Sequence, residues 1–363
     1  MALPSSGAMQ MGGNVNVELG SAATTQISLG QATVRTLYGI ASGAIRLAND
    51  GYGKSNIVYT QKAAFAYGYN PGAVNSIRYI SSSGVIGAIT PGTGTARSAG
   101  TGATYGNDKG FFAYGNNPGG SNYNIYNLMS NTGVVAADSP GVGTARSDSG
   151  GAKYGLDKGI IAYGRTSYSG WTTYSLSNLV SNTGVVASDT PGVGTARYNL
   201  SAAGYGNDKA FFAYGHYQYP AQSTTAPVKP KIHNLVSNTG VVASDTPNLG
   251  TGRSYTGAAA YGNDKAIIGF GNNSPAWTPQ SFVNTTNLVS NTGVVASDTP
   301  GIGTARVCYA AVNYGGDKAI FGGGGQSPYN VTNLVSNTGV VASNVTSPDT
   351  VATYMAAGYS ATA

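Results

Sequence analysis

The sequence predicts an all-β fold assembled from repeated antiparallel sheets, and two observations lead to this prediction. One phrase recurs along most of the chain: NLVSNTGVVASDTPGVGTAR starts at Asn178, and near-copies start at Asn127, Asn234, Asn287 and, in part, Asn333. Charged residues form only 9% of the 363 residues, whereas Gly, Thr, Val, Ser and Tyr are abundant, a composition that suits short strands and tight turns better than helices. A constant phrase with variable sequence between its copies indicates one structural unit used several times.

A second phrase fixes the length of that unit. It reads YGNDKAFFAYG at 205–215 and recurs in related forms between the copies of the first phrase. Its lysines are Lys62, Lys109, Lys158, Lys209, Lys265 and Lys318. They are 47, 49, 51, 56 and 53 residues apart, which gives six units of about 50 residues. Units of this length are typical of the four-stranded blades of a β-propeller, so we expect six blades.

Each unit divides into four expected strands, which the copy from 195 to 245 illustrates. The Ala/Gly-rich stretch 195–206 suits a narrow strand at the axis of a propeller. The second strand is expected at 209–215, after a tight Gly-Asn-Asp turn, and the third at 234–237. An Asn-Thr-Gly turn then leads to the outer strand at 241–245, from which a segment containing Pro and Gly carries the chain to the next blade.

The two ends of the repeat region predict a closed ring. The first unit starts near Ile57, at its second strand, and lacks an Ala-rich strand, whereas residues 351–363 align with the Ala-rich strand of the other units. We therefore expect residues 355–360 to form the innermost strand of the blade built by residues 57–90. This pairing closes the ring and removes the open sheet edges that favour aggregation. An open solenoid of the same units is the alternative architecture.

Residues 1–54 contain neither phrase, and we expect them to form a small N-terminal module beside a six-bladed propeller at 55–363. A capping pattern followed by apolar residues at helical spacing predicts a helix over 27–40. A second short helix is expected at 14–20.

Four ordered motifs in this module resemble an N-terminal segment of tail, fibre and other structural proteins of tailed bacteriophages: LPSSG (3–7), NVELG (16–20), ISL with VRTLYG (27–39) and SGAI with YGKS (42–55). The intervening GAMQMGGNV departs from the more polar, Ser-rich sequence expected there. The repeats resemble kelch-like propellers of phage and bacterial surface proteins, without the paired-glycine and Trp pattern of cellular kelch proteins. The resemblance implies a structural protein of the virion, oligomeric within the particle and attached to other virion subunits through its N-terminal module.

The acidic residues are distributed as structural groups. Glu18, the only glutamate, lies in the N-terminal module, and Asp148 and Asp349 occur singly. The repeated aspartates are Asp108, Asp157, Asp208, Asp264 and Asp317 in the first turn, and Asp138, Asp189, Asp245 and Asp298 before the Ser/Thr-Pro step. Residues copied in every blade have similar environments, whereas a catalytic carboxylate pair needs two different ones. We therefore expect turn formation and no enzyme activity.

The other candidate groups also suggest structure rather than chemistry. The repeated arginines are Arg97, Arg146, Arg197, Arg253 and Arg306. We expect them to pair with aspartates; a ring of arginines that binds an anion at the channel mouth is the alternative. His216 and His233, the only histidines, flank one loop and are expected to be solvated rather than to hold a metal. Cys308, the only cysteine, is expected to be a buried small residue. No catalytic, cofactor-binding or metal site is predicted.

The candidate binding residues lie where the repeats vary in length, between the second and third strands. These segments are 69–76, 116–126, 165–177, 216–233, 272–286 and 326–332. Because they connect equivalent strands, a ring places them all on one face. They hold both tryptophans and many Tyr, Asn and Ser residues, a composition typical of recognition loops on a rigid scaffold. The candidate contacts with a partner or a host-surface glycan are Trp171, Trp277, Tyr168, Tyr217 and Tyr219.

The leading hypothesis is a non-enzymatic phage virion protein, on the tail, a fibre or the capsid, whose loops recognise a host-surface glycan. A purely architectural or decoration protein whose loops pack against other virion subunits is the first alternative, and a carbohydrate-active enzyme is the least favoured. Drift in solvent-exposed loops is the simplest explanation of the loop variation. The net charge of +6 is scattered, which disfavours nucleic acid as a partner. No stretch suits a secretory signal or a membrane span, so we expect neither.

Overall fold

The computed structural model describes residues 60–69, 72–166, 172–217, 228–248, 250–275, 280–324, 330–347 and 356–362. They belong to one compact unit, Thr60–Thr362. The described residues form 20 strands and no helix, which confirms the all-β prediction for this part of the chain. Among them, no helix has the length and apolar character needed to cross a membrane. The helices expected at 14–20 and 27–40, and the domain boundary after residue 54, lie outside the described residues.

The strands form six antiparallel sheets of three or four strands each. The first joins β20 (Ala356–Thr362), β1 (Thr60–Tyr69) and β2 (Ala73–Ile80); the second joins β3 (Thr101–Tyr105), β4 (Lys109–Asn116) and β5 (Asn122–Met129). The third joins β6 (Gly150–Tyr154), β7 (Lys158–Ala162) and β8 (Ser177–Val180); the fourth joins β9 (Ser201–Tyr205), β10 (Lys209–Ala213), β11 (Ile232–Val236) and β12 (Thr246–Pro247). The fifth joins β13 (Gly257–Tyr261), β14 (Lys265–Gly269) and β15 (Thr286–Val289); the sixth joins β16 (Ala310–Tyr314), β17 (Lys318–Gly322), β18 (Val331–Val335) and β19 (Val345–Thr346).

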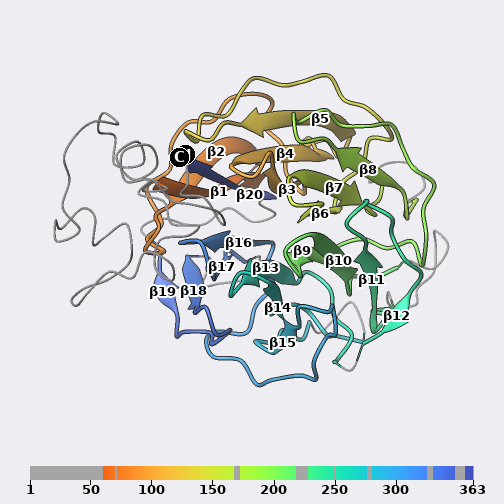
Figure 1. Cartoon of the computed structure of the whole chain (residues 1–363), viewed down its shortest axis with the longest axis vertical. Coiled ribbons are helices and arrows are strands. Elements are labelled where there is room, and N and C mark those ends of the chain that lie inside the picture. Colours follow the sequence, from red (N-terminus) through yellow and green to blue (C-terminus); the bar gives the residue numbers. More distant parts are fainter. Residues whose placement is uncertain are drawn as a thin grey trace, which may run out of the picture. The chain divides into compact units, whose positions relative to one another are not determined.

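Figure 1 shows these sheets in a propeller-like arrangement, with β20, β3, β6, β9, β13 and β16 nearest the centre. The Ala/Gly-rich segments therefore supply the inner strands, as expected. The end of the unit where each inner strand turns into the second strand is called the turn face below. The opposite end, where the variable segments leave the second strands, is called the loop face.

The C-terminal strand completes the first sheet. β20 pairs with β1 in antiparallel register, from Thr60 opposite Thr362 to Ala66 opposite Ala356. The predicted pairing of the C-terminal segment with the first repeat is thereby confirmed. Residues at opposite ends of the unit thus share one set of backbone hydrogen bonds.

The expected outer strand is wrong as a continuous element in most sheets. In the third sheet, the segment after β8 touches it only at single bridges, between Val180 and Val186 and between Ser177 and Thr190. Between these bridges, Asn178 Nδ2 donates hydrogen bonds to the carbonyl of Ala187 at 3.0 Å and to the carboxylate of Asp189 at 2.9 Å. The side-chain amide of Asn178 therefore takes the place of the backbone hydrogen bonds that a continuous outer strand, predicted from the pattern of apolar residues, would form.

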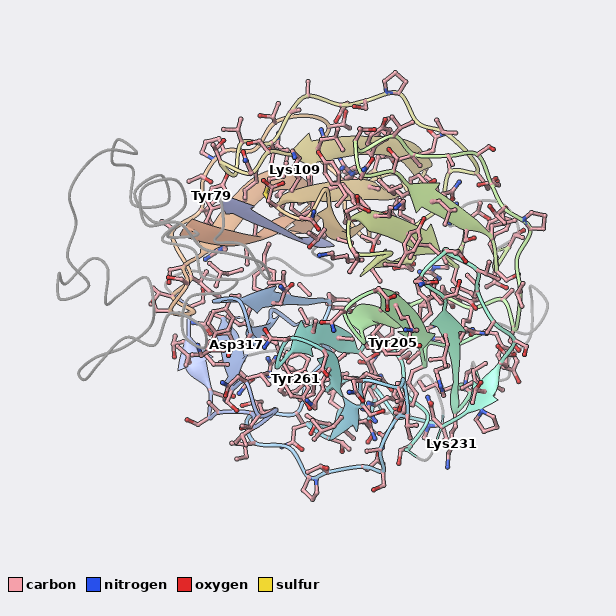
Figure 2. All side chains as sticks on the ribbon, viewed as in Figure 1. Tyr79, Lys109, Tyr205, Lys231, Tyr261 and Asp317 are labelled. Atoms are coloured by element: carbon pink, nitrogen blue, oxygen red, sulfur yellow. The ribbon has the colours of Figure 1, made fainter. Side chains whose placement is uncertain are left out.

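Apolar side chains fill the space between neighbouring sheets, as Figure 2 shows. In one of six such clusters, Ile160 of β7 packs with Phe212 of β10 and Val236 of β11. Gly150 on β6 makes room for the ring of Phe212, because a Cβ at this position would lie 3.0 Å from a ring carbon. Full burial of each large apolar side chain contributes about 1.5–3 kcal/mol. The core is thus a set of layers between sheets, which the repeated KAFFAYG phrase supplies.

A buried arginine joins each pair of successive sheets described here. The guanidinium of Arg197 lies over the ring of Tyr163 from the preceding sheet, at 4.2 Å from its centroid. Its Nε donates to the carbonyl of Tyr214 at 2.8 Å, and a terminal nitrogen donates to Asn234 Oδ1 at 2.7 Å. Asp245 lies 3.9 Å away as its counter-ion. We call this arrangement the arginine junction.

The arginine junction recurs around the unit. Its other arginines are Arg97, Arg146, Arg253 and Arg306, over Tyr67, Tyr114, Tyr214 and Phe270 respectively. All five arginines are at most 1% exposed. The expected pairing with aspartate is confirmed for four of them, and a ring of arginines open to an anion at the channel mouth is wrong. In the fifth, the aspartate position carries Asn344, whose Oδ1 accepts a hydrogen bond from the backbone of Thr304.

Removal of residues 351–363 is expected to lower the melting temperature sharply and to cause aggregation. The truncation deletes β20, so the backbone groups of β1 lose their partners and an open sheet edge is exposed. Scanning calorimetry and light scattering measure both effects. Deletion of Ala363 alone, outside β20, is the matched control and is expected to change neither. A truncated protein that stays monomeric at the wild-type melting temperature would contradict the role given to β20.

Arg197→Met is expected to reduce the free energy of unfolding by about 3 kcal/mol or more, because buried acceptors on Tyr214 and Asn234 lose their donors. Arg197→Lys is also expected to destabilise, since an ammonium group lacks the planar fork that reaches these acceptors. Lys209→Met is the control: Lys209 forms a surface ion pair with Asp208, and its loss is worth less than about 1 kcal/mol. Chemical denaturation measures all three.

Candidate functional site

Four of the five predicted contact residues, Trp171, Trp277, Tyr168 and Tyr219, lie outside the described residues. Tyr217 is described and is half-buried. Its backbone N donates to the carbonyl of Val228 at 3.2 Å, so it begins a short antiparallel pairing across the base of its loop. The described part of the chain therefore places one of the five residues, at the loop face, and leaves the clustering of the five a prediction.

The described bases of the variable segments lie beside the starts of the inner strands. Single antiparallel bridges join Ser147 to Arg165 and Tyr198 to His216. Equivalent bridges join Ser98 to Asn116 and Ser254 to Asn272. The first residue of each of these segments is thus held near the axis of the unit, on the loop face.

These positions form a group of aromatic and charged side chains that we call the axial cluster. It consists of Asp148, Arg165, Tyr198, His216, Tyr255 and Tyr309. Arg165 Nε donates to Asp148 Oδ2 at 2.6 Å, and its guanidinium lies 4.1 Å from the centroid of the Tyr198 ring. The row of rings continues from Tyr198 to His216 at 3.9 Å, to Tyr255 at 5.6 Å and to Tyr309 at a further 5.4 Å, measured between centroids.

Some side chains of the axial cluster are fully buried, and solvent reaches the others. Tyr198 and His216 are each 1% exposed, whereas Tyr255 and Tyr309 are half-buried and the side chain of Arg165 is 17% exposed. Burial lowers the pKa of Arg165, but the Asp148 carboxylate, Tyr198 and Tyr255 together outweigh burial, so the pKa of Arg165 is raised. Burial also raises the pKa of the Tyr198 hydroxyl. Arg165 is therefore held between the carboxylate of Asp148 and the buried ring of Tyr198, at the edge of the row of rings.

The expectation that both histidines are solvated is wrong. His216 packs between Tyr198 and Tyr255, and neither ring nitrogen has a hydrogen-bond partner among the described residues. Burial, reinforced by the charges of Arg165 and Lys229, lowers the pKa of His216 well below its ordinary value. His233 lies on β11, and its Nδ1 is 2.5 Å from Asn248 Oδ1. Among the described residues, no group of three or more His, Cys, Asp or Glu could hold a metal ion.

A small pocket of about 50 Å³ opens at the centre of the cluster, lined in part by Asp148, Ser149, Asn199, Tyr255 and Tyr309. Ser149 Oγ and Asn199 Nδ2 are buried and lack partners within the described chain. Asp148, Asn199 and Tyr255 have backbone φ angles between 52° and 56°. Residues other than glycine seldom adopt this left-handed conformation. Strained backbone of this kind is concentrated at functional sites.

The strained residues are held by a chain of backbone hydrogen bonds around the axis. Asn199 N donates to Asp148 O at 3.0 Å, Tyr255 N to Asn199 O at 2.9 Å, and Cys308 N to Tyr255 O at 2.9 Å. Cys308 is buried, as expected. Successive sheets thus fix one another at this point, so the side chains of the axial cluster project from a rigid base.

Sequence reasoning missed this cluster, although a signal was present. The phrase is constant up to the repeated arginine, and the next three residues then read SAG, SDS, YNL, SYT and VCY in the five copies. The end of this segment is again the same in all five copies, which share a Tyr-Gly pair. Variation at the start of an inner strand, on the same side as the variable loops, marks the centre of the loop face.

No protein-family model and no curated protein sequence matches the chain.

Protonation of His216 is expected to make stability depend on pH between 7 and 5. The unfolded chain binds a proton near the ordinary pKa of about 6.5, whereas the folded protein does not, because the pKa of His216 is lowered. The contribution of neutral His216 to the free energy of unfolding is therefore complete above pH 6.5. It decreases as the pH falls, by up to about 1.4 kcal/mol per pH unit. His216→Phe keeps an aromatic ring and is expected to reduce this slope.

Denaturant titrations at pH 5, 6 and 7 measure the slope. His233→Gln is the control; burial also lowers the pKa of His233, but its hydrogen bond with Asn248 opposes the shift, so a smaller change in slope is expected. An unchanged slope in His216→Phe would show that His216 does not titrate as argued.

Proposed function

We propose that residues 60–362 form a closed six-bladed propeller that serves as a non-enzymatic structural protein of a bacteriophage particle and binds a host-surface glycan through its loop face. Residues 1–54 are its attachment to other virion proteins. The axial cluster on the loop face is the observation that carries the binding role.

Closure is supported by the neighbours of β20. This strand contacts β3 on one side and β16 on the other, while β3, β6, β9, β13 and β16 contact one another in sequence order. A sheet composed of the first and last strands therefore links the second sheet to the sixth. A ring of this kind holds the loop bases in a fixed circle, as a recognition surface requires.

The structural role is supported by the use made of the repeated charged residues. Asp157 in a first turn accepts hydrogen bonds from Lys158 and Asn182, both at 3.0 Å, and Asp245 accepts from Thr195 and Asn234. Burial raises the pKa of Asp245, but the hydrogen bonds from Thr195 and Asn234 outweigh burial, so the pKa of Asp245 is lowered. Carboxylates with low pKa values and full sets of donors are poorly suited to act as general acids at neutral pH. The virion assignment itself rests on the resemblance of the N-terminal motifs.

The glycan assignment is supported by the chemistry of the axial cluster and the loops. Aromatic rings stack on the apolar faces of sugars, and charged pairs such as Arg165 with Asp148 can bind hydroxyl groups as donor and acceptor. The orphaned Ser149 Oγ and Asn199 Nδ2 offer further hydrogen bonds at the centre. Each contact is weak, but many copies on one particle add through avidity. A loop face buried against another virion subunit remains the architectural alternative.

Trp171→Ala combined with Trp277→Ala is expected to reduce host adsorption of whole particles about tenfold or more, because loss of stacked aromatic contacts is multiplied by copy number. Tyr309→Ala in the axial cluster is expected to act in the same direction. Leu156→Ala is the matched control: this residue is 59% exposed but lies in a hairpin turn on the turn face. The melting temperature of the tryptophan variant should be unchanged, since both residues lie outside the repeated phrases. Unchanged adsorption would favour the architectural role.

A further inference from the structure

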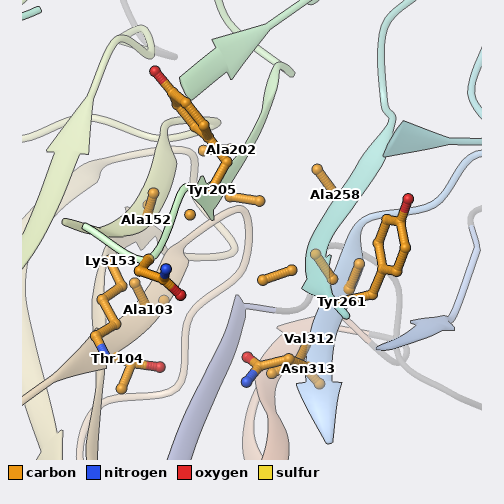
Figure 3. Close-up of a pocket in the computed structure, with 18 of the residues that line it drawn as sticks. Ala103, Thr104, Ala152, Lys153, Ala202, Tyr205, Ala258, Tyr261, Val312 and Asn313 are labelled. Carbon is orange, nitrogen blue, oxygen red and sulfur yellow. The ribbon is translucent and has the colours of Figure 1, made fainter. Parts of the chain in front are cut away.

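A second opening lies at the turn face. The inner strands and the turns that follow them line a cavity of about 440 Å³, drawn in Figure 3. Its described walls come from β3, β6, β9, β13 and β16 and the turns after them: Ala and Gly line it together with four asparagines, two tyrosines, Thr104, Lys153, Leu156 and Val312. Ligand pockets typically have volumes of roughly 300–1,000 Å³ and apolar walls with a few polar groups. The cavity has a volume in this range and combines Ala and Val side chains with polar groups; it lies toward the opposite end of the inner strands from the axial cluster.

Lys153 is the only charged residue among the described residues that line this cavity. The equivalent positions on neighbouring inner strands carry Thr104, Gly204, Ala260 and Asn313, each opposite the first residue after the register lysine of its sheet. All of these are uncharged. A repeated scaffold needs no lysine at this position, so its presence in one blade calls for a reason specific to that blade.

The Lys153 side chain is half-buried, and its ammonium group forms no hydrogen bond or ion pair within the described parts of the chain and is reached by solvent. Asp157, in the turn after β6, is engaged by Lys158 and Asn182. Burial lowers the pKa of Lys153, and the charge of Asp157 opposes this shift. The opposing charge of Asp157 is shared with Lys158, so a bound anion would further stabilise the partly desolvated charge of Lys153.

We propose that this cavity binds a small monocarboxylate, with its carboxylate on Lys153 and its short hydrocarbon part against the Ala and Val walls. The single positive charge of Lys153 matches the single negative charge of a monocarboxylate. Phosphate carries more charge and is often held by arginine forks, and the described lining contains no arginine. Thr104, which lies beside Lys153 in Figure 3, supplies an additional polar contact near the carboxylate. The inference does not depend on the glycan role of the loop face.

The test is calorimetric titration of the full chain with hexanoate and benzoate, with hexanamide as the uncharged match and inorganic phosphate as the competing anion. We expect saturable binding of a carboxylate and at least about tenfold weaker binding of hexanamide. Lys153→Met is expected to weaken carboxylate binding by about tenfold or more and to leave the melting temperature equal or higher. Lys158→Met, in the adjacent exposed turn, is the matched control and is expected to bind normally.

A second measurement uses the wild-type chain and so does not depend on the folding of a variant. Amine acetylation followed by mass spectrometry is expected to show that hexanoate slows modification of Lys153 several-fold and leaves Lys158 unaffected. Equal binding of hexanoate and hexanamide, normal binding by Lys153→Met, absence of protection at Lys153, or preference for phosphate would each overturn the proposal.

Discussion

The guanidinium group buried between successive sheets is the interaction on which the rest of this structure depends. Apolar packing holds two sheets together but has no preferred direction, whereas Arg197 must place its donors on Tyr214 and Asn234 at once. A buried charge is tolerated only when such bonds are satisfied. The junction therefore sets the relative orientation of two sheets, and its repetition sets a similar orientation at each step. The same arginines explain why the repeated phrase extends to an arginine in every copy, as Thr-Ala-Arg in four copies and Thr-Gly-Arg at 251–253.

The junctions divide the chain into constrained and unconstrained positions. Asn178, Asp189 and their equivalents are bound on several sides, so they have little freedom to change. The positions just after each arginine contribute little to the junction, and there the chain places Asp148, Tyr198 and Tyr255. Both proposed sites consist of departures from the repeat: the axial cluster at one end of the inner strands and Lys153 near the other. In an array of near-identical units, a residue that breaks the pattern near the axis is the best indication of function.

Local patterns predicted the parts of the fold that depend on local contacts. The spacing of the register lysines located all six second strands, and the alignment of residues 351–363 predicted the pairing of β20 with β1. The prediction of a continuous outer strand was wrong because a hydrogen bond from the side chain of Asn178 takes the place of backbone hydrogen bonds. The alternation of apolar residues does not reveal such a side-chain contact. His216 was misjudged because a residue at the start of a loop was taken to be solvated, whereas its neighbours Tyr198 and Tyr255 come from the segments that lead into two different inner strands, β9 and β13. The axial cluster brings together residues 148 to 309, and only the arrangement of whole sheets makes them neighbours.

The register of β1 with β20 has a consequence for how this protein can be tethered. Thr60 lies opposite Thr362, so the first and last described residues of the unit are adjacent, and both lie where the second strands begin, on the turn face. Any chain joined before Thr60 or after Thr362 therefore starts from that side. The unit has a polarity: the first residue of β1 and the last residue of β20 lie at the turn face, and the variable loops lie at the opposite end. A label or fused domain attached directly at Thr60 or Thr362 would thus start at the turn face, away from the variable loops.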